Sequence, residues 1–328
     1  MKNSFFFVFL IVILPSIYSI SSIVSPSNNS ILTDLNQTIE VQTFHISNIS
    51  TFINWNSSLV AYWNFESGSA DLSDNGNNGQ FFSGLSSSLG GVRGRRINCD
   101  GINDLFSTQD IDFGPGNKLS ISLWVNPDAS NSGDRFIVSK NRYFSLNPYL
   151  ISYSNSTNTY TFSVNGNIAR SNTYLPNNWN HVVGVFNGTH AKIYLNSILE
   201  DIAVVPSIIS NNDILGICAS TDTPTQYPFR GSIDEIVIFD RDLSLNEIQS
   251  LYNSQIYPLS FNVFNLENNS LYSYDIFSIN SSGFLLKENY NFFTNTSYTY
   301  PQILVSSAFP FFNIFSFLFF LCLFFLGF

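Results

Sequence analysis

The segment Leu119-Ser120-Ile121-Ser122-Leu123-Trp124-Val125 places an apolar side chain at every second position. Successive side chains of a β-strand point to opposite faces of a sheet, so this period of two predicts a strand with one buried face. Comparable short apolar segments are Tyr160–Val164, His181–Phe186 and Ala191–Leu195. The dipeptides Asn165-Gly166 and Asn187-Gly188 follow two of them and are typical of hairpin turns. Many short strands with turn signals predict an antiparallel sandwich or jelly roll over residues 59–255.

One helix is expected at the end of this region. Ser244-Leu245-Asn246-Glu247 has the spacing of a capping box, in which Ser and Glu satisfy each other's backbone N–H groups. The apolar residues Leu243, Ile248, Leu251 and Tyr252 then fall on one helical face. We expect this helix to cover an open rim of the sandwich.

Both ends of the chain predict export and attachment to a membrane. Lys2, the apolar run Phe5–Leu14 and the small residue Ser19 have the layout of a signal peptide over residues 1–20. An uncleaved N-terminal anchor is the alternative. Residues 309–328 carry no charge and have the length of a membrane-spanning helix, about 30 Å at 1.5 Å per residue. No Lys or Arg follows them, and the small residues Asn295-Thr296-Ser297 precede a spacer, so a lipid-anchor signal competes with a spanning helix.

Two further segments flank the predicted jelly roll. Residues 21–58 are rich in Ser, Asn, Thr and Ile, and alternation over Ile39–Phe44 predicts one or two strands in a lead-in segment. Residues 256–308 show some alternation, for example over Tyr272–Ile279, and predict a β-rich stalk.

Composition narrows the choice of partners. The 13 Lys and Arg residues against 23 Asp and Glu residues give a net charge of -10, which argues against nucleic acid or anionic lipid as the main partner and suits metal cations. Of the three cysteines, Cys322 lies in the apolar tail. Cys99 and Cys218 are either bridged or two buried thiols. Nine Asn-x-Ser/Thr triplets are candidate glycosylation sites: Asn28, Asn36, Asn48, Asn56, Asn155, Asn187, Asn268, Asn280 and Asn295.

Four blocks occur in the order found in laminin-G-like, pentraxin-related jelly rolls. They are Leu59–Glu66 (LVAYWNFE), Asp71–Gly79 (DLSDNGNNG), Trp179–Phe186 (WNHVVGVF) and Gly231–Asp240 (GSIDEIVIFD), the last running into the predicted helix. Between them, Cys99-Asp100-Gly101 resembles the Phe-Asp-Gly turn of that family, with Cys in place of Phe. The resemblance covers about residues 59–255 and implies an all-β, two-sheet antiparallel jelly-roll sandwich of concanavalin A-like type. It also implies a domain that binds glycans or surface proteins.

The resemblance implies a structural calcium ion, and its metal positions fall on Asp71, Asn77 and Asp234. Hard cations take several carboxylate, amide or backbone oxygens, and a Gly/Asn-rich loop can turn such oxygens inward. Asp74 stands where the family usually has Gly. The alternative is that Asp71 and Asp234 cap turns through local hydrogen bonds.

The sequence favours a binding protein over an enzyme. A retaining glycosidase needs two carboxylates about 5 Å apart. Glu235 and Asp240 are five residues apart and hence on opposite faces of a strand unless a bulge intervenes. We therefore expect a surface-anchored recognition or adhesion protein on the extracellular side, with a structural cell-envelope subunit and a glycan-active enzyme as alternatives.

Other residues are assigned by their local pattern. We expect Trp63, Trp124, Trp179 and His181 to be structural, because they lie in or beside apolar strands. The cluster of Arg93, Arg95 and Arg96 is expected at a solvated strand edge, with contact to an acidic glycan as the alternative. Candidates for a binding surface lie in loop-like segments: Tyr143, Tyr149, Tyr153 and Tyr227.

Overall fold

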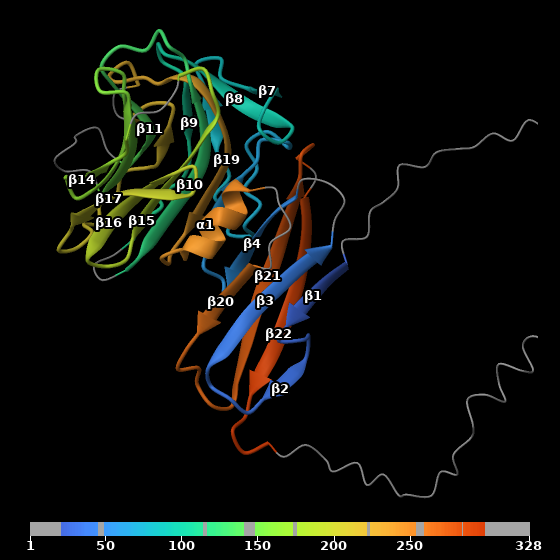
Figure 1. Cartoon of the computed structure of the whole chain (residues 1–328). Coiled ribbons are helices and arrows are strands. Elements are labelled where there is room, and N and C mark those ends of the chain that lie inside the picture. Colours follow the sequence, from blue (N-terminus) through green and yellow to red (C-terminus); the bar gives the residue numbers. More distant parts are fainter. Residues whose placement is uncertain are drawn as a thin grey trace, which may run out of the picture. The chain divides into compact units, whose positions relative to one another are not determined.

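The computed structural model describes residues 21–44, 49–113, 117–140, 148–172, 176–221, 224–253, 259–283 and 285–298 (Figure 1). The predicted signal peptide, residues 1–20, and the predicted apolar C-terminal helix, residues 309–328, lie outside these ranges. Among the described residues no helix has the length and apolarity required to span a membrane.

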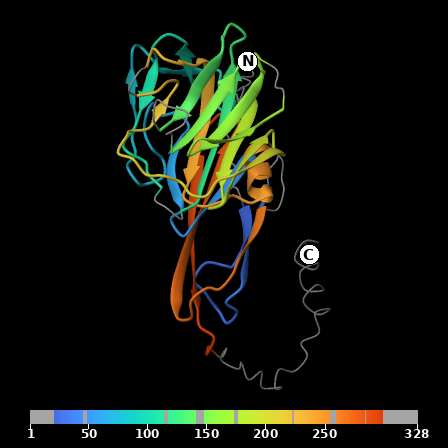
Figure 2. The same cartoon turned by 90° about the vertical axis from the view of Figure 1, so that its left-hand side faces the viewer.

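Two antiparallel sheets form the jelly roll. The eight-stranded sheet contains β17 (Ile198–Val204), β16 (His190–Leu195), β15 (Asn180–Phe186), β10 (Leu119–Pro127), β19 (Arg230–Phe239), β8 (Arg95–Asp100) and β7 (Ser87–Leu89) in spatial order, and β5 (Leu59–Trp63) also pairs with β19. The seven-stranded sheet contains β14 (Asn167–Arg170), β13 (Thr159–Val164), β12 (Tyr149–Ser154), β11 (Asp134–Ser139), β18 (Gly216–Ile217), β9 (Leu105–Ser107) and β6 (Gln80–Phe82). Figure 2 shows neighbouring strands of the jelly roll side by side in the green-to-yellow part of the ribbon. The predicted all-β jelly-roll fold is confirmed.

One hydrophobic core lies between the two sheets. On β10 the alternation predicted from the sequence directs Leu119, Ile121, Leu123 and Val125 into this core. A disulfide between Cys99 of β8 and Cys218, which follows β18, joins the two sheets across it. The structure thus selects the bridged alternative for these cysteines.

The predicted turns and helix are present. Asn165 and Gly166, with φ of 47° and 77°, connect β13 to β14 as a hairpin turn requires. The helix α1 (Leu245–Tyr252) begins with a capping box between Ser244 and Glu247. Its buried face includes Ile248 and Leu251.

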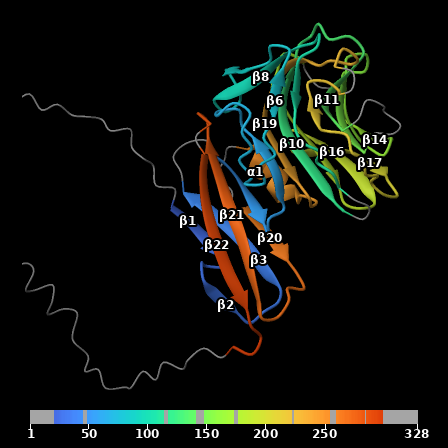
Figure 3. The same ribbon diagram turned by 180° about the vertical axis from the view of Figure 1, so that it is seen from behind.

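The two segments that flank the jelly roll form a second β-sandwich. A three-stranded sheet contains β1 (Ser21–Ser25), β3 (Gln37–Phe44) and β20 (Leu259–Val263), and a four-stranded sheet contains β2 (Ser30–Leu32), β22 (Leu285–Thr294), β21 (Ser270–Asn280) and β4 (Ile49–Trp55). In Figure 3 the blue N-terminal strands lie beside the orange and red C-terminal strands. Buried residues from both segments, including Ile39, Ile53 and Phe292, share one core.

This second sandwich corrects the expectation of a lead-in segment and a separate stalk. Each sheet pairs a strand from residues 21–55 with one from residues 259–294, for example β4 with β21. Neither segment alone can form two facing sheets. The strands of residues 21–55 therefore bury their apolar face only when they pair and pack with the strands of residues 259–294. A third core cluster joins β4 and β21 to the eight-stranded sheet, with the Phe52 ring 5.4 Å from that of Tyr62.

Candidate functional site

The loop after β5 folds around the carboxylate of Asp71. Oδ1 accepts hydrogen bonds from the backbone N–H groups of Tyr62 at 3.0 Å and Ser73 at 2.9 Å. Oδ2 accepts from the backbone N–H of Asn77 at 2.9 Å and from the Ser73 hydroxyl at 2.7 Å. All four partners are donors, and together they fix the loop as a turn-capping carboxylate does.

Asp234 belongs to a different hydrogen-bonded group. It is fully buried on β19, where its Oδ2 accepts from the backbone N–H of Arg93 at 3.1 Å and its Oδ1 from that of Glu235 at 2.8 Å. Glu235 Oε2 accepts a hydrogen bond from the Tyr62 hydroxyl at 2.9 Å and lies 4.0 Å from the Arg93 guanidinium. The Arg93 side chain also donates to the carbonyl of Leu251 in α1 at 3.4 Å.

A β-bulge places these two successive acids beside one arginine. The register between β10 and β19 shifts between Ser122 and Trp124, opposite Asp234. Glu235 has φ of 51°, in the left-handed region that non-glycine residues rarely adopt. A bulge breaks the strict alternation of faces, so Asp234 and Glu235 both reach the surroundings of Arg93.

Burial dominates the electrostatics of this cluster. It raises the pKa of Asp234 well above the usual range, and the neighbouring Glu235 raises it further. Burial also raises the pKa of Glu235, an effect that the nearby Arg93 opposes. The cluster is closed to solvent and connects β5, β19 and α1, so it suits a structural role.

The contacts of the three predicted calcium ligands favour turn capping. Calcium binds six to eight oxygens, whereas the carboxylate oxygens of Asp71 and Asp234 face N–H and O–H donors. Asn77 meets Asp71 through its backbone N–H, and its side-chain amide donates to the carbonyl of Val60 at 2.8 Å. The described ranges contain no group of three or more His, Cys, Asp or Glu side chains that could hold a metal ion. Calcium binding stays a prediction.

His181 lies in a closed aromatic environment beneath α1. Its ring centroid is 5.1 Å from that of Trp124 and 5.9 Å from that of Tyr252, and its Nε2 is 2.8 Å from the Ser122 hydroxyl. Its Nδ1 is buried and has no hydrogen-bond partner among the described residues. Burial lowers the pKa of His181 to about 3, and the positive charge of Arg93 contributes to this shift. The ring is therefore neutral at physiological pH, as expected of a structural histidine.

A hollow of about 220 Å³ lies on the outer face of the seven-stranded sheet. Its lining residues come from four adjacent strands: Asp134, Ser152, Thr161, Ile168 and Arg170. The inward neighbours on the same strands, such as Ile151 and Phe162, belong to the core, so alternation places Ser152 and Thr161 on the opposite face, where both are nevertheless buried. Ser152 and Thr161 are directly paired, with their hydroxyl oxygens 2.5 Å apart. We call these five residues the sheet hollow.

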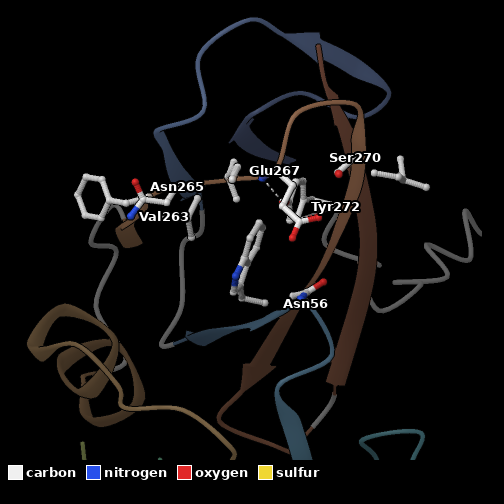
Figure 4. A pocket seen from close by; sticks show the side chains of 10 residues that line it. Asn56, Val263, Asn265, Glu267, Ser270 and Tyr272 are labelled. Atoms are coloured by element: carbon white, nitrogen blue, oxygen red, sulfur yellow. Dashed lines mark hydrogen bonds between the residues drawn. The ribbon is translucent and has the colours of Figure 1, made fainter. Parts of the chain in front are cut away.

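A larger pocket of about 660 Å³ lies in the second sandwich (Figure 4). Its walls combine aromatic rings, including Trp55 and Tyr272, with polar side chains such as Asn56, Asn265 and Glu267. The rings of Trp55 and Tyr272 are stacked with centroids 5.7 Å apart. We call this space the sandwich pocket.

A comparison with known protein families finds one family that matches the jelly roll. Residues 100–249 match the family model Laminin_G_3, described as the concanavalin A-like lectin/glucanases superfamily. The jelly roll is a laminin-G-like domain. The match begins at the end of β8 and extends into α1, so the laminin-G-like domain includes the sheet hollow. A search of curated protein sequences finds none that matches the chain.

Solved structures with a similar fold include domain 4 of AbnA, a GH43 extracellular arabinanase from Geobacillus stearothermophilus, in complex with arabinotriose. It is 16% identical with a TM-score of 0.48, over 60% of this chain and 98% of that domain. The binding domain of Paraclostridial Mosquitocidal Protein 1 is 20% identical with a TM-score of 0.47, over 61% and 52%. The botulinum neurotoxin serotype D ligand-binding domain in complex with N-acetylneuraminic acid is 15% identical with a TM-score of 0.47, over 61% and 51%. The chain thus spans about half the length of these toxin domains.

Several residues differ from their predicted positions. Tyr149 and Tyr153 are fully buried because they occupy the inward face of β12, so neither contributes to a binding surface. Tyr227 is 39% exposed and stacks on Phe136, whereas Tyr143 lies outside the described residues. Arg93 is buried rather than at a solvated edge.

Sequence reasoning assigned no ligand-binding role to the residues of the sheet hollow or of the sandwich pocket. For the sheet hollow a signal existed: hydroxyl residues alternate with apolar ones along β12 and β13. For the sandwich pocket, the lining comes from segments more than two hundred residues apart, which no local pattern connects.

Proposed function

We propose that the protein is an exported, membrane-anchored recognition protein that binds a glycan in the sheet hollow of its laminin-G-like domain. The observation that supports this most directly is the chemistry of the hollow. A carboxylate and a guanidinium, from Asp134 and Arg170, lie on strands at either side of two paired hydroxyl groups. Ile168 adds an apolar contact within the same hollow.

This combination complements a sugar ring. A carboxylate accepts two hydrogen bonds from neighbouring sugar hydroxyls, and a guanidinium donates to hydroxyl or carboxylate oxygens in a fixed fork. The C–H groups of a sugar ring match an apolar side chain such as that of Ile168. Arg170 favours glycans with an acidic group, because its charge is exposed at the rim.

The residues of the sheet hollow are suited to binding a glycan and not to hydrolysing it. Asp134 is the one carboxylate among its five lining residues, whereas glycosidases use a pair separated by about 5 to 9.5 Å. The adjacent acids Asp234 and Glu235 are both buried and hydrogen-bonded, so they offer no accessible pair to a substrate. We therefore propose a non-catalytic domain.

The disulfide supports the proposed location. Bridges such as Cys99–Cys218 form and persist mainly in oxidising compartments, which chains reach through export. The apolar residues 309–328 would then hold the exported protein at the membrane. Deleting 309–328 should release it from the membrane fraction into the medium, and continued retention would count against the anchor.

A glycan array probed with the full-length protein tests the proposed binding. We expect saturable binding to acidic glycans that Arg170→Ala weakens by about tenfold or more, as the loss of a charged anchor does. Lys118→Ala is the matched control, because Lys118 is an exposed cation outside the hollow whose partner is Asp242. Binding that Arg170→Ala and Asp134→Ala leave unchanged would contradict the assignment. An array without any hit would favour a structural cell-envelope subunit.

A further inference from the structure

We infer that the sandwich pocket is a second carbohydrate site, specific for an uncharged sugar and separate from the sheet hollow. Its volume of about 660 Å³ lies within the range of about 300–1,000 Å³ typical of small-ligand pockets. Its lining residues belong to β4, to the segment from β20 to β21 and to the start of β21: Trp55, Asn56, Val263, Phe264, Asn265, Leu266, Glu267, Ser270, Leu271 and Tyr272.

An aromatic cluster in the core of the second sandwich borders this pocket. Tyr274 and Phe292 are buried, and Phe292 stacks with Trp55 at 6.0 Å and with Tyr272 at 5.6 Å. Trp55 and Tyr272 are partly exposed where the cluster borders the pocket. The buried rings thus hold the cluster in place, while Trp55 and Tyr272 present aromatic surface to a ligand.

Backbone contacts fix the loop that forms the rim. The backbone N–H of Leu266 donates to the carbonyl of Leu35 at 3.0 Å, and that of Glu267 donates to the Tyr272 hydroxyl at 2.7 Å. The Thr294 hydroxyl donates to the carbonyl of Glu267 at 2.5 Å. A rim held in this way loses little conformational entropy when a ligand binds.

The polar groups of the rim surround the aromatic surface. Figure 4 shows Glu267, Ser270 and Tyr272 on one side of the pocket, Val263 and Asn265 on the other, and Asn56 at a third position. The Glu267 side chain is exposed and lines the pocket. Carboxylate and amide groups around a flat ring match a pyranose, whose faces carry C–H groups and whose edges carry hydroxyls.

Charge selects the class of sugar. The ten lining residues include Glu267 and no Lys or Arg, so the pocket disfavours sialic or uronic acids. This preference is opposite to that of the sheet hollow, where Arg170 favours an acidic glycan. The two sites are therefore distinguishable by the ligands they bind. A Pro-rich peptide could stack on the aromatic surface, but its proline residues lack the N–H donors that the Glu267 carboxylate would accept.

One lining residue, Asn56, begins the triplet Asn56-Ser57-Ser58 and is a candidate glycosylation site. A glycan attached there would compete for the pocket. The test therefore uses full-length protein produced in a host that adds no N-linked glycans.

The experiment compares the wild type with three variants on an array of neutral hexose and N-acetylhexosamine oligosaccharides, sialylated oligosaccharides, and Pro-rich peptides. Trp55→Phe keeps an aromatic ring in the cluster but reduces the stacking area, and Glu267→Gln keeps the shape of the rim but removes its charge. Phe82→Ala is the matched control, since Phe82 is 43% exposed on β6 in the laminin-G-like domain. Thermal unfolding of each variant confirms that it folds.

We expect saturable binding to neutral oligosaccharides that Trp55→Phe and Glu267→Gln each weaken by about fivefold to tenfold and Phe82→Ala leaves unchanged. Arg170→Ala should reduce binding to the sialylated oligosaccharides and leave binding to the neutral oligosaccharides unchanged. A failure of this inference can therefore be distinguished from a failure of the proposed function. Neutral-sugar binding that folded Trp55→Phe and Glu267→Gln retain at wild-type strength would overturn the inference. So would an array on which the protein binds peptides and no neutral sugar.

Discussion

Lowering the pH from 7 to 4.5 should destabilise the laminin-G-like domain through His181. The ring is 1% exposed, lies against both Trp124 and Tyr252, and hydrogen-bonds to Ser122 through Nε2. A charged imidazolium there would lack water and would lie near the cation of Arg93, and these two effects lower the pKa of His181 to about 3. In the unfolded chain the same side chain titrates near 6.5.

The size and sign of the effect follow from linkage between proton binding and folding. Between pH 6.5 and pH 3 the unfolded state binds a proton that the folded state does not, so stability falls as the pH decreases. The stabilising contribution of the neutral His181 ring is fully present above pH 6.5. For pKa values of 6.5 and about 3, the free energy of unfolding should decrease by about 2.5 kcal/mol between pH 7 and pH 4.5.

Asp234 and Glu235 act in the opposite direction. Burial raises the pKa of both carboxyls, so the folded state binds protons more readily than the unfolded state, and this contribution to stability is lost as the pH rises through their raised pKa values. The pH dependence of the wild type alone therefore mixes two effects. The difference between wild type and His181→Asn isolates the histidine, because both proteins retain the two carboxyls.

Urea unfolding at several pH values, followed by tryptophan fluorescence, measures this difference. The stability advantage of the wild type over His181→Asn should shrink by about 2.5 kcal/mol from pH 7 to pH 4.5. Parallel stability curves for the two proteins over that interval would refute the reasoning, because they would mean that His181 titrates alike in the folded and unfolded states.

Two further predictions concern the disulfide and the calcium ion expected from the sequence. The Cys99–Cys218 bridge spans a sequence separation of 119 residues, for which the loop-entropy relation gives about 4.9 kcal/mol at 25 °C, so reduction should lower the free energy of unfolding by roughly 2–5 kcal/mol. Equal unfolding midpoints before and after reduction, with free thiols verified, would contradict this. If calcium binds as the sequence resemblance implies, a chelator should lower the melting temperature of the wild type but not of Asp234→Asn. Identical melting temperatures in chelator and in millimolar calcium would leave Asp71 and Asp234 as turn caps.

Local patterns were sufficient to predict the strands of the jelly roll. The segment Leu119–Val125 lies within β10, and Ala191–Leu195 lies within β16, because alternation and turn residues are encoded over a few positions. The order in which these strands pair within the sheet could not be predicted from such local patterns. β10 pairs with β15 and β19, which follow it by dozens of residues, and these non-local pairings have no signature in a short window of sequence.

The buried acids show a second limit of pattern reasoning. Strict alternation assigns Asp234 and Glu235 to opposite faces, and only a bulge, with Glu235 in a left-handed conformation, places both beside Arg93. The bulge is tied to tertiary contacts, because Asp234 accepts from the backbone of Arg93 and Glu235 accepts from the hydroxyl of Tyr62. The sequence therefore identified Asp234 as a special residue but not the partners that determine its chemistry.

The second sandwich shows why the flanking segments were misjudged. Taken alone, residues 21–58 and 256–308 offer too few strands to bury an apolar face, and a lone hairpin is at best marginally stable. In the structure, Trp55 of the first segment stacks on Tyr272 and Phe292 of the second, so each segment supplies the aromatic surface that the other lacks. The sandwich can form only after the intervening laminin-G-like domain has been synthesised. Consequently the sandwich pocket, whose lining comes from both segments, exists only in a chain that retains both flanks of the jelly roll.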